Sequence, residues 1–231
     1  MRNQSLKAKG RRWQQEVEYN LKEIFLHLDG NDVLSRPMGS QGSDLILSPK
    51  ALEVLPYDFE MKNQERSKIW ADLRQSEDRL ETQLMYPILM LKRNHLKNPL
   101  KKGIAVIPFA HYCSLLTHHR GLTEIDHMMS ARCVFDILGK STPVCCVAAL
   151  REAASDLYEI MTSRECRVDW KFLHLDNHEP IRFHHAKALN IWTEFTGQPL
   201  LFDRNDSDHT MYIAVRAEVF YGLLSELNAY L

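Results

Sequence analysis

The stretch that decides the fold is Asp58-Phe59-Glu60-Met61-Lys62-Asn63-Gln64, which predicts a strand that ends in charged side chains. Alternate side chains of a strand share one face, so Glu60 and Lys62 point the same way. A second acid, Asp44, lies sixteen residues before Glu60, in the predicted strand Gly42-Ser43-Asp44-Leu45-Ile46-Leu47. The two strands could pair as a hairpin. The pattern therefore predicts that two carboxylates and one amine converge.

Two acidic side chains beside a lysine suit a hydrolysis that depends on Mg²⁺. Carboxylate oxygens hold a hard cation, and a lysine orients a water molecule or stabilises charge on a phosphate. A Glu-x-Lys pair is also common in exposed strands as a solvated ion pair. The pair alone therefore leaves the structural alternative open, and the surrounding elements have to decide.

The predicted elements around these residues favour the catalytic interpretation. Residues 11–28 predict an amphipathic helix with one apolar stripe. Residues 36–43 are rich in turn formers, and their glycines allow a backbone to approach a phosphate closely. Helices are also predicted at 50–54 and 65–85, and strands at 44–48, 57–62, 87–92 and 103–107.

Four parts of the first half carry a resemblance to a known family: Lys9-Gly10-Arg11-Arg12-Trp13-Gln14-Gln15-Glu16, Ser35-Arg36-Pro37-Met38-Gly39-Ser40, Asp44 and Glu60-Met61-Lys62-Asn63-Gln64. They resemble the PD-(D/E)xK nuclease superfamily, in its branch of Holliday-junction resolvases and phage endonucleases. Archaeal resolvases show a similar Lys-Gly before the first helix, a similar Gly-Ser ahead of the catalytic aspartate, and a similar Glu-x-Lys after it.

This resemblance implies an α/β fold like that of restriction endonucleases, with a mixed central sheet flanked by helices. It also implies a metal site for Mg²⁺, for which Mn²⁺ would substitute. The metal would be bound by Asp44, Glu60 and the main-chain carbonyl of Met61, and Lys62 would position the attacking water.

The first helix departs from the family pattern. The family's helical glutamate falls on Gln14, and Glu16 follows two residues later. A neutral amide binds Mg²⁺ more weakly than a carboxylate, so either Gln14 acts through its carbonyl oxygen or Glu16 takes its place. The two positions lie about 200° apart around a helix, so only one can face the metal.

The charge is divided unevenly along the chain. Residues 1–102 hold 18 Lys and Arg against 14 Asp and Glu, whereas residues 103–231 hold 11 against 16. Basic side chains that neutralise phosphates give nucleic-acid affinity without sequence preference. The positive half therefore predicts a DNA partner, with these candidate phosphate contacts: Lys9, Arg11, Arg12, Arg36 and Ser40.

The composition sets wide limits on location. A hydrophobic content of 45% and a charged content of 26% are those of an ordinary globular protein. No apolar run reaches the length of a membrane span, and no apolar stretch follows the basic start. We therefore expect a cytoplasmic protein with no membrane partner. The five cysteines are odd in number and favour reduced thiols.

The second half contains segments that repeat the strands of the first half without its charged residues. With one deletion, Tyr86–Asn94 is similar to Gln198–Asn205, and Ile104–Val106 is similar to Ile213–Val215. These pairs predict an internal repeat of about 110 residues. In this repeat the counterpart of the Glu-x-Lys strand is expected at Phe172–Asn177, which holds no acid-x-lysine pair.

These observations predict two domains, a PD-(D/E)xK nuclease domain at 1–118 and a degenerate nuclease-like or accessory domain at 119–231. The function they predict is a Mg²⁺-dependent, structure-selective DNA endonuclease of recombination or repair. The sequence leaves the oligomeric state open, and the resemblance to resolvases implies a homodimer because a four-way junction needs two cuts. Two alternatives remain open: a sequence-specific or restriction-type endonuclease, and a non-catalytic DNA-binding accessory protein.

Overall fold

The computed structural model describes residues 2–66, 68–80, 85–93, 100–109, 111–112, 115, 182–184, 189–197, 199–203 and 211–229. The chain divides into two compact units. Unit 1 comprises Met1–Ile107, Asn190–Gly197 and Ala214–Leu231, and unit 2 comprises Pro108–Leu189 and Gln198–Ile213. The domain boundary predicted at 118/119 lies outside the described residues.

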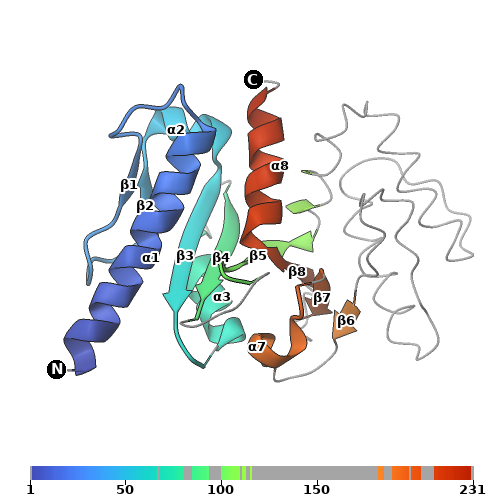
Figure 1. Cartoon of the computed structure of the whole chain (residues 1–231). Helices are drawn as coiled ribbons and strands as arrows, with labels where there is room; N and C mark the ends of the chain where they lie inside the picture. The colour runs from blue at the N-terminus through green and yellow to red at the C-terminus, as the bar shows by residue number, and fades with distance from the viewer. Residues whose placement is uncertain are drawn as a thin grey trace, which may run out of the picture. The chain divides into compact units, whose positions relative to one another are not determined.

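Unit 1 begins with a long helix, α1 (Arg2–Ile24), drawn in blue in Figure 1. Its apolar stripe recurs every four residues and is buried at Trp13, Val17 and Leu21. This spacing places the three side chains on one face of the helix. The helix starts earlier than the predicted residue 11 and ends four residues before the predicted residue 28.

A short hairpin follows, formed by β1 (Val33–Ser35) and β2 (Leu45–Leu47), which pair antiparallel. The predicted hairpin between the Asp44 strand and the Glu60 strand does not form, because β2 belongs with β1 to a separate sheet, although the Asp44 N–H donates to the Phe59 carbonyl. The connecting loop turns through Gly42, whose φ of 114° is strained for any side chain. A Cβ there would also lie 3.0 Å from the Arg36 guanidinium.

The main sheet starts after α2 (Pro49–Val54), a helix capped by the Ser48 hydroxyl. β3 (Tyr57–Asn63) pairs in parallel with β4 (Tyr86–Lys92), and α3 (Ile69–Glu77) makes the crossover that a parallel pair requires. β5 (Ile104–Pro108) then pairs antiparallel with β4. In unit 1 the strand order is β3-β4-β5-β8, where β8 spans Met211–Arg216.

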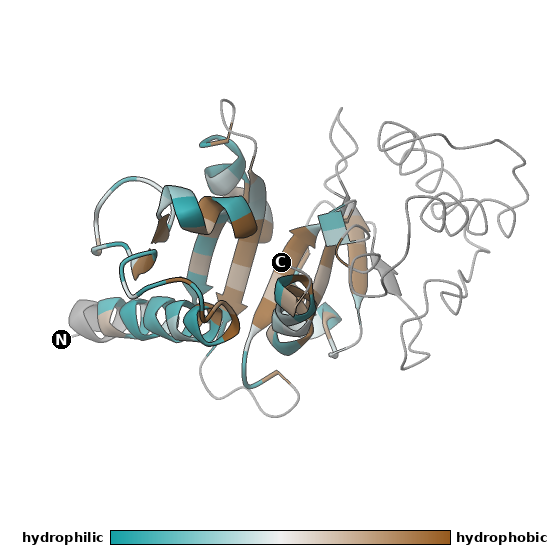
Figure 2. Ribbon diagram, turned by 90° about the horizontal axis from the view of Figure 1, so that it is seen from above, coloured by the Kyte–Doolittle hydropathy of each residue, from teal (hydrophilic) through white to brown (hydrophobic). Residues whose placement is uncertain are grey.

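Helices cover both faces of this sheet, which confirms the predicted mixed α/β arrangement. Tyr57 points to one face and packs edge-on against Phe220 of α8 (Ala217–Ala229), with ring centroids 5.9 Å apart. Asp58 points to the other face, where Ser76 of α3 donates to it. Figure 2 shows α1 and α8, at the N and C labels, on the same side of the largely hydrophobic strands.

Trp13 fastens α1 to the sheet. Its indole N–H donates to the Met90 carbonyl at 3.0 Å, and Lys92 lies 4.7 Å above its ring. Gly103 leaves the space that the ring needs, because a Cβ there would lie 2.8 Å from the indole. Gly103 also has a φ of 97°, so both the space for the ring and the backbone conformation require glycine.

In unit 2, β6 (Arg182–His184) pairs in parallel with β7 (Leu200–Asp203). The short helix α7 (Ile191–Glu194) belongs to unit 1. Among the described helices, none combines the length and apolar character that a membrane span requires.

Candidate active site

The site is built on the outer edge of β3. This strand is the first in the sheet order, so no described strand pairs with its outer backbone groups. Ser43 satisfies them: its hydroxyl accepts from the Phe59 N–H at 3.0 Å and donates to the Phe59 carbonyl at 3.1 Å. The Asp44 N–H also donates to that carbonyl at 2.8 Å. The edge of β3 therefore fixes the position of Asp44.

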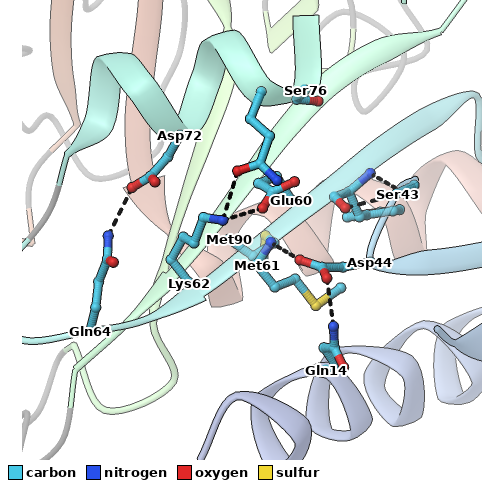
Figure 3. Close-up of polar contacts among 12 residues, drawn as sticks. Gln14, Ser43, Asp44, Glu60, Met61, Lys62, Gln64, Asp72, Ser76 and Met90 are labelled. Carbon is cyan, nitrogen blue, oxygen red and sulfur yellow. Dashed lines mark hydrogen bonds and ion pairs between the residues drawn. The ribbon is translucent and has the colours of Figure 1, made fainter. Parts of the chain in front are cut away.

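The Asp44 carboxylate is held from two sides, as Figure 3 shows. Oδ2 accepts from the Met61 N–H at 2.6 Å, and Oδ1 accepts from the Gln14 amide at 2.6 Å. The N–H and C=O of one strand residue leave the strand on the same side. The Met61 carbonyl therefore points to the edge where Asp44 lies.

Burial raises the pKa of Asp44, and the negative charge of Glu60 raises it further. The hydrogen bonds from Met61 and Gln14 and the charge of Lys62 only partly oppose this rise. An ionised Asp44 is therefore costly in this place. A bound cation would relieve both the burial penalty and the repulsion between the two carboxylates.

Glu60 and Lys62 lie on the face of β3 that looks toward α3, as the alternation predicts. Glu60 is only 3% exposed. The Lys62 ammonium pairs with Oε1 of Glu60 and donates to the Gln75 carbonyl oxygen at 3.0 Å. The buried acid thus holds the amine between two oxygen acceptors.

Arg79 is the residue that sequence reasoning missed. Its guanidinium contacts Oε2 of Glu60 at 2.9 Å and pairs with both oxygens of Asp58, one of which also accepts from Ser76 at 2.8 Å. Gln75 and Ser76 lie in the last turn of α3, and Arg79 follows in the turn after the helix ends at Glu77. That spacing of polar residues is the signal that could have found Arg79.

The first helix contributes Gln14 and not Glu16. Gln14 is 5% exposed and contacts Asp44, and its own carbonyl oxygen is buried with no hydrogen-bond partner among the described residues. Glu16 instead accepts from the Lys92 ammonium at 2.6 Å. The two side chains thus face different neighbours, as their helical spacing requires.

The predicted DNA contacts divide into two groups. Arg11 donates to the Arg36 carbonyl at 3.0 Å, and Arg36 donates to the Ser43 carbonyl at 2.6 Å. Both guanidinium groups therefore brace the loop in front of Asp44, although each retains further N–H donors. The other three lie at the surface, with Arg12 and Ser40 exposed and Lys9 half-exposed.

The donor set of this site fits a hard cation. Asp44 and Glu60 supply two carboxylates, and each oxygen that accepts one hydrogen bond keeps a second lone pair. The buried oxygen of Gln14 and the carbonyl of Met61 add neutral oxygens. All-oxygen sets suit Mg²⁺. Nowhere in the described part of the chain do three His, Cys, Asp or Glu side chains form a cluster that could hold a metal.

Comparisons with known proteins add no relative: the chain matches no protein-family model, no curated protein and no solved structure. The interpretation of this site therefore depends on its own residues and geometry.

Proposed function

We propose that the chain is a Mg²⁺-dependent DNA endonuclease of the PD-(D/E)xK type, structure-selective and resolvase-like, that acts in DNA recombination or repair. The observation that carries the proposal is the convergence at β3. Asp44 is bonded to the strand's outer edge, and the Glu60–Lys62 pair stands on its α3 face.

In this proposal Asp44, Glu60 and the Met61 carbonyl hold Mg²⁺, and the free oxygen of Gln14 completes the set. The bound metal would neutralise charge on the scissile phosphate and lower the pKa of a coordinated water. Gln14 also keeps Asp44 in place through its amide N–H. The protein's part is thus to fix the carboxylates at one edge of one strand.

Lys62 positions the attacking water. An ammonium group has three donors, and Glu60 and Gln75 occupy two of them. The third remains to orient a water molecule or to meet the charge that develops on the phosphate. Because Arg79 shares Glu60 with Lys62, the carboxylate cannot swing away from the amine without also breaking its contact with a second cation.

Two basic side chains of α1 and a serine hydroxyl of the loop that follows β1 would contact the DNA backbone. Arg12 and Lys9 lie on the first helix, and Ser40 lies on the loop whose base is braced by Arg36. Contacts of this kind with phosphates weaken steeply as salt rises.

One observation favours a second candidate, a DNA-binding accessory protein with a closed site. Both oxygens of Glu60 already have cationic partners, Lys62 and Arg79. A site whose carboxylate is fully neutralised by the protein has less need of a metal. The raised pKa of Asp44 argues for the enzyme, because the direct contacts of that carboxylate are neutral donors and the charge of Lys62 does not offset its burial.

The test incubates the purified chain with Mg²⁺ and four labelled DNA substrates: linear duplex, single strand, flap and four-way junction. We expect cleavage of the junction above the others, and none by the Asp44→Asn variant. Asp32→Asn is the matched control, because Asp32 is a buried carboxylate that bonds Ser48 and the Asp29 N–H away from the site.

The outcomes separate the candidates. Cleavage by the parent and by Asp32→Asn, with none by Asp44→Asn, supports the enzyme. Junction binding without cleavage in Mg²⁺ or Mn²⁺ supports the accessory protein and contradicts the enzyme. Equal cleavage by the parent and Asp44→Asn points to another site or a contaminating nuclease.

A further inference from the structure

The pairing of β6 with β7 repeats the pairing of β3 with β4. Both pairs are parallel. When β4 and β7 are aligned at the Arg-Asn that follows each strand, with the one-residue deletion placed nearer the prolines, Leu91 matches Phe202. In the sheet, Leu91 pairs with Lys62 and Phe202 pairs with His184. This register makes His184 the counterpart of Lys62.

The helices after these strands give the same alignment independently. Trp70 follows Lys62 by eight residues at the start of α3, and Trp192 follows His184 by eight residues at the start of α7. Two separate observations, a strand register and a spacing along the chain, therefore agree on one alignment.

At the position of Glu60 this alignment places Arg182. The segment Phe172–Asn177, expected from the sequence as the counterpart, lies outside the described residues, and the strand paired with β7 is Arg182–His184. A guanidinium is always protonated and has no acceptor, so it cannot be a ligand of a metal cation. The second strand therefore lacks the acid that the chemistry requires.

The last strands of the two segments are also equivalent. β5 and β8 share Ile-Ala-Val, and a tyrosine follows each isoleucine by eight residues, at Tyr112 and Tyr221. Within unit 1, β8 is the neighbour of β5. In a dimer with two-fold symmetry, the same surface of both subunits forms the interface. Here the two equivalent strands, β5 and β8, lie in one chain.

We propose that the chain is a fused pair of nuclease-like repeats with a single cutting centre, so that each molecule acts as a monomer and cuts one DNA strand. The proposal rests on the proposed function and deepens it. It replaces the expected homodimer with two coordinated cuts, because the second repeat has Arg182 and His184 where the first has Glu60 and Lys62.

The first experiment follows supercoiled plasmid that carries a cruciform, with DNA in excess over protein. We expect nicked circles to accumulate, and linear DNA to appear only later through a second, independent cut. Linear DNA formed as fast as nicked circles would overturn the single centre while leaving the nuclease function intact. No cleavage of any kind would contradict the nuclease function itself.

The second experiment mixes the parent with an excess of the Glu60→Gln chain, again with DNA in excess. A monomer should keep the full rate per parent chain, because it needs no active partner. A rate that falls as inactive chains are added would show that two active chains must assemble, which contradicts the proposal. Light scattering on the same mixture reports the mass of the species.

A third readout does not depend on cleavage. Calorimetric titration with Mn²⁺ should find binding that is lost in Asp44→Asn and unchanged within about two-fold in Arg182→Ala, because the first repeat has an acid at the position where the second has Arg182. A site of similar affinity that survives Asp44→Asn would reveal a second centre and overturn the proposal. Absence of any Mn²⁺ binding by the parent would contradict both the metal site and the nuclease function.

Discussion

The two sides of β3 carry similar side chains but differ in how fully their polar groups are satisfied. Toward α3, both oxygens of Glu60 and both oxygens of Asp58 have donors, most of them from Arg79. Toward the outer edge, Asp44 has a raised pKa, and the Gln14 oxygen has no partner among the described residues. Buried polar groups are normally satisfied, so exceptions need a reason. The ion pairs on the first side stabilise the fold and fix Glu60 and Lys62 in place, whereas the second side keeps oxygen acceptors that a ligand can use.

The largest expected effect comes from a substitution at the outer edge of β3. Asp44→Asn should lower the cleavage rate by at least about a hundred-fold, the scale seen when one stabilising group is lost from an active site. Stability should not fall, because the new amide removes a costly buried charge and can still accept from the Met61 N–H. Cleavage kinetics and urea unfolding measure the two effects.

The Asp32→Asn control should show the reverse pattern. It should lower the unfolding free energy, because Ser48 and the Asp29 N–H lose a charged acceptor, and it should leave cleavage unchanged. If both variants lose activity only in proportion to stability, the distinction between the two sides of β3 fails.

The next largest effect comes from removing the ion pairs on the α3 side of β3. Arg79→Ala should destabilise the fold by about 3 kcal/mol, because it leaves the buried acids Asp58 and Glu60 without their shared cation. Arg74→Ala, in α3, is the control, since an exposed side chain should change stability by less than about 0.5 kcal/mol. Urea titrations of the parent and the two variants measure these differences in unfolding free energy. Equal stability of Arg79→Ala and the parent would mean that these ion pairs contribute nothing.

A smaller effect appears in the pH dependence of stability. The raised pKa means that the folded state holds the Asp44 proton more tightly than the unfolded state does. Unfolding free energy should therefore fall as pH rises from the ordinary carboxyl pKa through the raised one. Asp72, whose pKa burial also raises, contributes equally to the parent and to Asp44→Asn, so it cancels in their difference.

That difference is the quantity to measure. The stability of Asp44→Asn relative to the parent should grow with pH across this window, and Mg²⁺ should reduce the gap by stabilising the ionised parent. A difference that is independent of pH, with and without Mg²⁺, would show that Asp44 ionises freely.

The smallest expected effect concerns the first helix. Gln14→Ala should raise the Mg²⁺ concentration needed for half-maximal cleavage by about ten-fold, the lower end of what supporting groups at metal sites contribute. Glu16→Ala should leave it unchanged, because Glu16 pairs with Lys92. Gln14→Glu should lower it, since a carboxylate binds the metal more tightly than an amide. Equal shifts in Gln14→Ala and Glu16→Ala would remove the helix from the site.

Local rules were enough to predict the chemistry-bearing face of β3. The placement of Glu60 and Lys62 together follows from alternation within one strand, and needs no knowledge of the fold. The partner of that strand was predicted wrongly, because the parallel pairing with β4 is a long-range contact made across α3. A hairpin between neighbouring strands is the simpler assumption from sequence.

The parts of the site that sequence left open depend on tertiary packing. Whether Gln14 or Glu16 faces Asp44 depends on the rotation of α1, which the seating of Trp13 on the sheet determines. Arg79 was missed because its partners lie 19 and 21 residues earlier and no motif links them. The proposed equivalence of Arg182 and Glu60 depends on the register of β6 with β7, which the sequence alone does not give.

The most direct test of the central claim is the initial rate of four-way junction cleavage as Mg²⁺ is titrated, for the parent, Lys62→Ala and Lys22→Ala. Lys22 is the matched control, because it pairs with Glu18 away from the site. We predict that the parent and Lys22→Ala saturate with Mg²⁺ at similar rates, and that Lys62→Ala leaves the junction uncut at every concentration. A parent chain that binds the junction at saturating Mg²⁺ and releases no product, or a Lys62→Ala chain that cuts at the parent rate, would contradict the claim.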